Sequence, residues 1–201
     1  MGRPRAYDLE AALDSVRDLF WEQGYEQVSI GALERCTGLD RSSLYNAFGS
    51  KRALFEAALT RYEALVRAQL ARMHDANVGV DDIAAFFGET ARELRADAGG
   101  ARRGCFMANT IAELGGTDGF ASEAGTRYRD ALHAAFAAVL DRAASRGEVD
   151  ATLNVARSRM LAVAVLGCSL SARLDPVDAA ETADAVAAEV RSWRLRPASH
   201  G

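Results

Sequence analysis

Residues 29–51 read SIGALERCTGLDRSSLYNAFGSK, and this stretch indicates two short helices separated by a tight turn. Ser29 and Asp40 each precede one of the helices, and serine and aspartate are side chains that cap helix N-termini. The first helix ends before Gly38, which permits the left-handed backbone of the turn that follows. The second helix occupies residues 41–48. Together the two helices have the outline of a helix-turn-helix.

Polar side chains stand at the N-terminal turn and along the exposed side of the second helix. A recognition helix presents such side chains to base edges in the major groove of DNA. Leu44 and Phe48 are four residues apart and are expected to face the protein core instead. The candidate base-reading residues are Arg41, Ser42, Ser43 and Asn46.

Residues that can donate to phosphate flank these positions. Ser29 stands at a helix N-terminus, Tyr45 lies beside the base-reading residues, and Lys51 begins the next helix, where the helix dipole already favours an anion. Arg3 and Arg5 lie in an N-terminal arm that could reach the adjacent minor groove. The formal net charge of the whole chain is −4, so positive charge is a local feature. Each of these residues alone also fits an ordinary role as a cap or a solvated charge.

The stretch quoted above resembles the N-terminal signature of the TetR-type transcriptional regulators, and the close resemblance covers roughly residues 8–55. Four residues fall at that family's spacing: Gly38, Tyr45, Phe48 and Lys51. The resemblance implies a dimeric repressor that binds double-stranded operator DNA and whose C-terminal domain binds a small effector. It also implies phosphate contacts and base contacts at the positions named above. Ser42 and Ala47 depart from the family's usual residues, so the base preference does not carry over.

The rest of the chain favours helices as well. One residue in five is alanine and only three are proline, and alanine loses no side-chain entropy in a helix. Apolar residues recur at helical spacing and predict an all-α fold of nine helices. Together with this pattern, the resemblance implies an N-terminal three-helix helix-turn-helix domain and a C-terminal helical ligand-binding and dimerisation domain. The predicted helices occupy residues 9–23 with Asp8 as cap, 30–36, 41–48, 51–73, 80–94, 105–114, a segment centred on 128–143, 155–172 and 176–193.

These helices suggest a division of the chain. We expect a DNA-binding domain with its basic arm at residues 1–50, an effector-binding and dimerisation domain at 51–195, and a disordered tail at 196–201. The last two helices suit a homodimer interface, because the segment 155–172 is apolar almost all round and must be covered on several sides. Its small residues, such as Gly167, would let two backbones approach closely. Burial of this helix within one subunit is the alternative.

The effector site is expected between the middle helices. Aromatic side chains there suit a partly apolar small molecule, with amide and imidazole groups as polar contacts. The candidate residues are Phe86, Cys105, Phe106, Asn109, Tyr128, His133 and Phe136. Plain core packing is the alternative for most of them. Cys105 also follows two arginines at a predicted helix N-terminus, which favours a thiolate, so a redox or electrophile sensor competes with a buried structural thiol.

Other function classes find little support. The chain has no GxGxxG, Walker, GxSxG or HExxH motif, and Asp130 and His133 lack a second metal-binding pair, so we expect no enzyme, cofactor or metal. Three cysteines without CxxC spacing suggest reduced thiols. The longest uncharged stretch has 13 residues and no secretory signal begins the chain, so we expect a cytoplasmic protein without a membrane span. A helical interaction module that does not bind DNA is the remaining rival.

Overall fold

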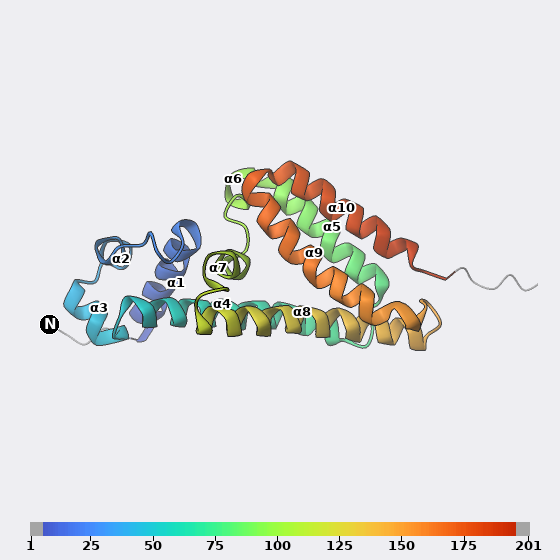
Figure 1. The fold of residues 1–201 in the computed structure, drawn as a ribbon, viewed down its shortest axis with the longest axis horizontal. Helices are drawn as coiled ribbons and strands as arrows, with labels where there is room; N and C mark the ends of the chain where they lie inside the picture. The colour runs from blue at the N-terminus through green and yellow to red at the C-terminus, as the bar shows by residue number, and fades with distance from the viewer. Residues whose placement is uncertain (1–5, 196–201) are drawn as a thin grey trace, which may run out of the picture. The chain divides into compact units, whose positions relative to one another are not determined.

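The computed structural model describes residues 6–195 of the 201-residue chain. All regular elements within that range are helical, which confirms the predicted all-α class (Figure 1). Among the described residues, nine α-helices have eight residues or more, and a tenth segment, α6 (Ala98–Ala101), is a single turn between the helices predicted at 80–94 and 105–114. The predicted tail at 196–201 lies outside the described residues.

The first three helices follow the local signals closely. They are α1 (Ala6–Gln23), α2 (Ile30–Thr37) and α3 (Arg41–Phe48). Ser29 and Asp40 cap α2 and α3 as predicted, and Gly38 has a φ of 69° in the turn between them. The predicted cap at Asp8 is wrong, because α1 begins at Ala6. No glycine or proline separates Ala6 from Leu9, so the sequence holds no signal that would stop the helix short of Ala6.

The remaining six helices are α4 (Lys51–Ala71), α5 (Val80–Ala96), α7 (Phe106–Leu114), α8 (Gly119–Ser145), α9 (Asn154–Leu174) and α10 (Pro176–Ser192). Five of them agree with the prediction to within about two residues at each end, and the sixth, α8, begins nine residues before the apolar stripe that predicted it. Short 3-10 turns at Arg72–His74 and Ala151–Leu153 follow α4 and precede α9. Asp175 caps α10 by accepting from the Val177 and Asp178 N–H groups, directly before the proline that opens the helix.

The chain forms two compact units. The N-terminal unit contains the described residues up to Val66 together with Cys105–Gly125, and the C-terminal unit contains Arg67–Gly104 and the described residues from Thr126 onward. The N-terminal unit is therefore larger than the expected DNA-binding segment 1–50, because it also contains most of α4, all of α7 and the start of α8. The assignment of functions to segments 1–50 and 51–195 is a separate matter and stays a prediction.

Aromatic rings fill the core of the N-terminal unit. The ring centroids of Phe20 and Phe55 lie 5.3 Å apart, those of Tyr25 and Phe55 lie 4.9 Å apart, and those of Trp21 and Tyr62 lie 5.2 Å apart. Such pairs stabilise a fold by about 0.5–1.5 kcal/mol each beyond the area that they bury. We call this set the aromatic cluster: Phe20, Trp21, Tyr25, Phe55, Tyr62 and Phe106.

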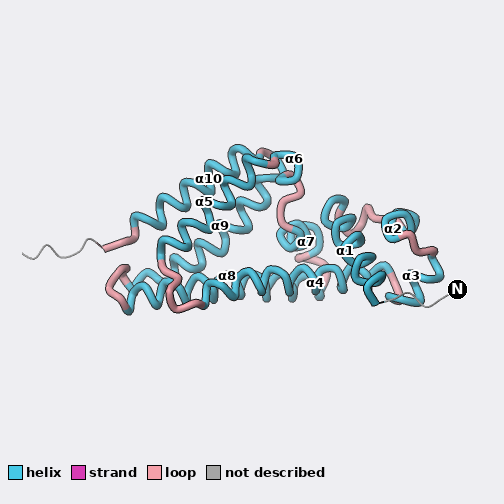
Figure 2. The backbone as a smooth tube through the Cα atoms, turned by 180° about the vertical axis from the view of Figure 1, so that it is seen from behind, coloured by secondary structure: helices cyan, strands magenta, loops and turns pink. Residues whose placement is uncertain are grey.

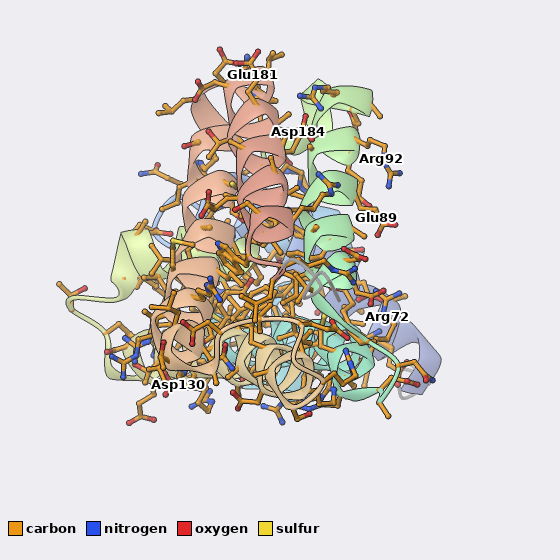
Figure 3. The ribbon with its side chains drawn as sticks, turned by 90° about the vertical axis from the view of Figure 1, so that its right-hand side faces the viewer. Arg72, Glu89, Arg92, Asp130, Glu181 and Asp184 are labelled. Carbon is orange, nitrogen blue, oxygen red and sulfur yellow. The ribbon has the colours of Figure 1, made fainter. Side chains whose placement is uncertain are left out.

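In the C-terminal unit, α5, α9 and α10 run side by side (Figures 1 and 2). Small side chains, Ala91, Cys168, Ala180 and Ala183, form the contact between the three helices. Charged side chains extend outward from two of these helices, Glu89 and Arg92 from α5 and Glu181 and Asp184 from α10 (Figure 3). Asp184 also forms an ion pair with Arg95 of α5, with 2.7 Å between nitrogen and oxygen.

The outer face of α9 is apolar instead. Its exposed side chains include Val155, Met160, Val163, Leu170 and Leu174, and Leu174 is 82% exposed. By length and composition the helix Ala151–Leu174 could cross a membrane, and only 28% of its most apolar window is buried. This test of length and composition does not place the helix in a membrane, so the expectation of no membrane span stays a prediction. The helix passes the test because it extends beyond the 13-residue uncharged stretch, past an arginine at each end.

Candidate nucleic-acid interface

The polar face of α3 is open to solvent. Arg41, Ser42 and Asn46 are exposed, Ser43 is half-buried, and Tyr45 is 37% exposed. Leu44 is buried and Phe48 is half-buried, as their spacing predicts. The N-terminal turn of α3 thus presents hydrogen-bonding groups outward while its opposite side packs on the protein.

Both short helices begin with a side-chain cap. Ser29 Oγ accepts from the Ala32 N–H at 3.2 Å, which leaves the hydroxyl hydrogen for another acceptor. Asp40 Oδ1 accepts from the Ser43 N–H at 2.7 Å. Hydrogen bonds from the backbone and then the hydroxyl of Ser43 hold the pKa of Asp40 below its ordinary value. These caps orient the helix starts, where N–H groups point outward and favour an anion.

Aromatic rings hold two of the candidate cations. The Arg41 guanidinium lies 5.6 Å from the centroid of the Tyr45 ring. Lys51 Nζ lies 4.5 Å from the centroid of the Tyr25 ring, and it donates to the Glu26 carbonyl oxygen at 3.4 Å. Attraction to the face of an aromatic ring restricts the position of a cationic side chain without removing its charge. Arg3 and Arg5, the predicted minor-groove contacts, lie outside the described residues.

Two carboxylates from the segment 105–125 also contact this part of the molecule, and the sequence pattern did not reveal them. Glu113 on α7 accepts the N–H groups of Tyr25 and Glu26 at 3.0 and 2.9 Å. Asp118 pairs with Arg52 through two guanidinium nitrogens, one of them at 2.8 Å. The one local signal is Gly24, whose φ of 80° marks the turn that Glu113 holds.

The seven candidate effector residues divide between the two units. Cys105, Phe106 and Asn109 belong to the N-terminal unit, at the start of α7. Four belong to the C-terminal unit: Phe86, Tyr128, His133 and Phe136. Phe86 and Phe136 pack with ring centroids 5.9 Å apart. His133 Nε2 is buried and has no hydrogen-bond partner among the described residues.

A separate groove lies within the C-terminal unit. It has a volume of about 330 Å³ and is formed by the end of α5, by α6 and by α9. None of the seven candidate residues lines it. Its lining combines two carboxylates with small and apolar side chains: Thr90, Glu93, Leu94, Asp97, Gly100, Ala101, Gly104, Cys168, Ser169 and Ala172.

Cys105 sits in an apolar setting. It is 7% exposed, and its Sγ lies 3.1 Å from the Tyr62 hydroxyl oxygen. Burial, followed by the neighbouring thiol, raises the pKa of Tyr62. Burial likewise raises the pKa of the Cys36 and Cys168 thiols. A thiol packed beside rings and a neutral phenol fits a structural role better than that of a reactive sensor.

Comparisons with known proteins agree with this geometry. The family model described as "Bacterial regulatory proteins, tetR family" matches residues 12–58, and that described as "Tetracyclin repressor-like, C-terminal domain" matches residues 75–189. The HTH-type transcriptional repressor ComR of Escherichia coli is 30% identical over 179 residues, which is 86% of this chain and 82% of ComR. The HTH-type transcriptional repressor BdcR of the same species is 38% identical over 74 residues, 35% of this chain and 38% of BdcR.

Solved structures give the same result. A cysteine mutant of the TetR family transcriptional regulator CifR in complex with 26-base-pair operator DNA is similar with a TM-score of 0.74 and 28% identity, over 96% of this chain and 100% of that one. The reduced form of E. coli NemR has the same fold, with a TM-score of 0.80 at 20% identity over 96% of this chain and 99% of that one. The chain therefore belongs to the TetR family and is a DNA-binding transcriptional regulator.

Proposed function

We propose that this regulator is a cytoplasmic repressor that binds a palindromic operator as a homodimer and leaves it when a small molecule binds. The observation that carries the proposal is the exposed polar face of α3 between two capped helix starts. The similarity to ComR, whose name describes a repressor, supports the sign of regulation. The same match weighs against an enzyme and against an interaction module that does not bind DNA.

In the proposed complex, α3 enters the major groove. Arg41, Ser42, Ser43 and Asn46 read base edges, and Ser29, Tyr45 and Lys51 contact phosphates. Arg3 and Arg5 reach the minor groove. Two copies of α3 must then stand about 34–36 Å apart, one turn of DNA, to enter successive major grooves. An effector that favours another spacing releases the DNA.

The proposed dimer uses α9 and α10. The outer face of α9 combines large exposed apolar side chains with Gly167, where a second helix can approach closely. Soluble proteins rarely leave such an apolar surface exposed, so a surface of this kind marks a site of protein–protein contact. The charged outer side of α5, with Glu89 and Arg92 in Figure 3, suits solvent instead. If a second copy of the chain covers this face of α9, the dimer also explains why so apolar a helix is mostly exposed in one subunit.

For the effector, we propose a partly apolar molecule with at least one hydrogen-bonding group. The packed rings of Phe86 and Phe136 offer apolar contact, and the unsatisfied Nε2 of His133 offers a polar one. Tyr128 on α8 belongs to the same unit as these rings, and Cys105, Phe106 and Asn109, at the start of α7, stay predicted effector residues. The sensor alternative at Cys105 is not favoured, because the thiol is buried beside Tyr62.

The test begins with a random-sequence duplex library selected on the purified protein. Binding of the recovered duplex is then followed by fluorescence anisotropy as salt is raised. Lys51, Arg3 and Arg5 in two subunits give a slope of log affinity against log salt of about −5. A twofold-symmetric selected sequence and a steep slope support the proposal. Failure to enrich any sequence, or binding that does not depend on salt, would refute it.

A further inference from the structure

The turn between α1 and α2 is held by a side chain from far along the chain. Glu113 Oε2 accepts from the Tyr25 N–H at 3.0 Å, and Oε1 accepts from the Glu26 N–H at 2.9 Å. An added Cβ at Gly24 would lie 2.8 Å from Glu113 Oε2, so glycine there also makes room for the carboxylate. Each carboxylate oxygen takes one peptide N–H, and hydrogen bonds to an ionised acceptor are the stronger kind.

The residues that Glu113 holds are those on which Lys51 rests. The Tyr25 ring lies under Lys51 Nζ, and the Glu26 carbonyl oxygen accepts from the same ammonium group. The peptide units of Tyr25 and Glu26 therefore connect the carboxylate of Glu113 to a proposed phosphate contact. A shift of Glu113 away from the turn lengthens both hydrogen bonds from these N–H groups and loosens the turn, because hydrogen bonds weaken with distance and poor alignment.

The chain just after α7 is held by a second carboxylate, Asp118. Asp118 accepts from the N–H of Ala121 at the start of α8 and pairs with Arg52 on α4, one residue after Lys51. Glu113 stands one helical turn after Asn109 on α7, and Asn109 is one of the predicted effector residues. Displacement of α7 by an effector would therefore move the Glu113 carboxylate relative to the turn.

We propose that Glu113 is a positioning residue for DNA binding: its carboxylate holds the turn at residues 24–26, and thereby Lys51, in the geometry that grips phosphate. The inference rests on the proposed function and adds a physical connection from α7 to the DNA contact. Glu113 itself touches no DNA in this account.

The direction in which DNA affinity changes when Glu113 is neutralised distinguishes a positioning role from a purely electrostatic one. Removing a negative charge near a DNA-binding surface by itself leaves affinity unchanged or raises it. Glu113→Gln removes that charge but also replaces one acceptor oxygen by an NH₂ group that cannot accept an N–H. We expect the variant to bind the selected duplex about tenfold more weakly. The matched control, Glu22→Gln, removes the same charge from an exposed site on α1 and should bind as tightly as the wild type or slightly more tightly.

A double-mutant cycle with Lys51→Ala tests the route. If Glu113 acts by positioning Lys51, Glu113→Gln lowers the salt slope as Lys51→Ala does, and it costs less than about twofold once Lys51 is already absent. Additive losses, in which Glu113→Gln still costs about tenfold when Lys51 is absent, would overturn the proposal. So would equal or tighter binding by Glu113→Gln alone.

Hydrogen exchange gives a readout that does not depend on DNA. In the wild type the amides of Tyr25 and Glu26 should be protected, and Glu113→Gln should expose these amides while the core of α4 stays protected. Unchanged exchange at the turn would refute the inference even if binding fell. If the wild type binds no selected duplex, the proposed function fails instead, and the exchange experiment still decides whether Glu113 holds the turn.

Discussion

Asp118→Asn tests the ion pair that joins the loop before α8 to the start of α4. The Asp118 carboxylate pairs with two nitrogens of Arg52, which also contacts Glu56 at 2.6 Å. It accepts the Ala121 N–H at 2.8 Å as well. Asparagine keeps the shape and can still accept from Ala121, but it loses the charge and the paired geometry with Arg52. The substitution thus removes one interaction from a site that otherwise stays intact.

The magnitude follows from the pKa of Asp118. Hydrogen bonding to Arg52, with a further contribution from the Ala121 N–H, lowers the pKa of Asp118 from 3.8 to about 2. A difference of this size between folded and unfolded states corresponds to about 2.5 kcal/mol. The two side chains are 33% (Arg52) and 20% (Asp118) exposed, so solvent screening reduces the expected stabilisation to about 1–1.5 kcal/mol.

The dependence on pH has a definite sign. Because the folded pKa is the lower one, the unfolded chain binds more protons in acid, and the stabilisation is lost as the pH falls. It is complete above about pH 5, and roughly half of it has gone by pH 3. The free-energy difference between wild type and Asp118→Asn should therefore be largest at neutral pH and shrink below pH 4.

Urea unfolding followed by circular dichroism, at several pH values from neutral to about pH 3, measures this difference. The matched control is Asp130→Asn on α8, where the carboxylate is 63% exposed and pairs with its neighbour Arg129 at 3.1 Å. We expect the control to change the free energy of unfolding by less than about 0.5 kcal/mol. A neutral-pH difference as small as that of the control, or one that stays constant down to pH 3, would refute the reasoning.

Four further outcomes are expected. Lys51→Ala should weaken binding to every duplex and lower the salt slope by about one unit for each Lys51 in the dimer, measured by anisotropy; an unchanged slope contradicts a phosphate contact. Arg41→Ala should change the sequence selected from a random library, and recovery of the same motif would remove its base-reading role. Val163→Glu should weaken dimerisation at least about 100-fold in sedimentation equilibrium, because a carboxylate would be buried in the apolar interface; a dimer of undiminished strength would exclude this face. In alkylation followed by mass spectrometry, Cys36, the half-buried thiol, should react before Cys105, and the reverse order would revive the sensor hypothesis.

Most of the fold could be predicted because its signals are local. The caps at Ser29, Asp40 and Asp175 and the left-handed glycine at Gly38 each act within a few residues of their own position. The start of α1 was missed because an acidic side chain suits the first turn as well as the cap. The exposed side of α3 was predicted because helical periodicity separates Leu44 from the polar residues around it.

Contacts across the chain were decided only by tertiary structure. Glu113 and the turn that it holds are 88 and 87 positions apart, and Arg52 and Asp118 are 66 apart. Periodicity indicates which face of a helix is apolar, but not which other helix covers that face. It therefore predicted aromatic residues in the middle helices without dividing them between two units. The amino-acid sequence determined where helices begin, end and turn, since those choices depend on neighbouring residues. Which carboxylate accepts a hydrogen bond from which backbone N–H group depended on how the helices pack in three dimensions.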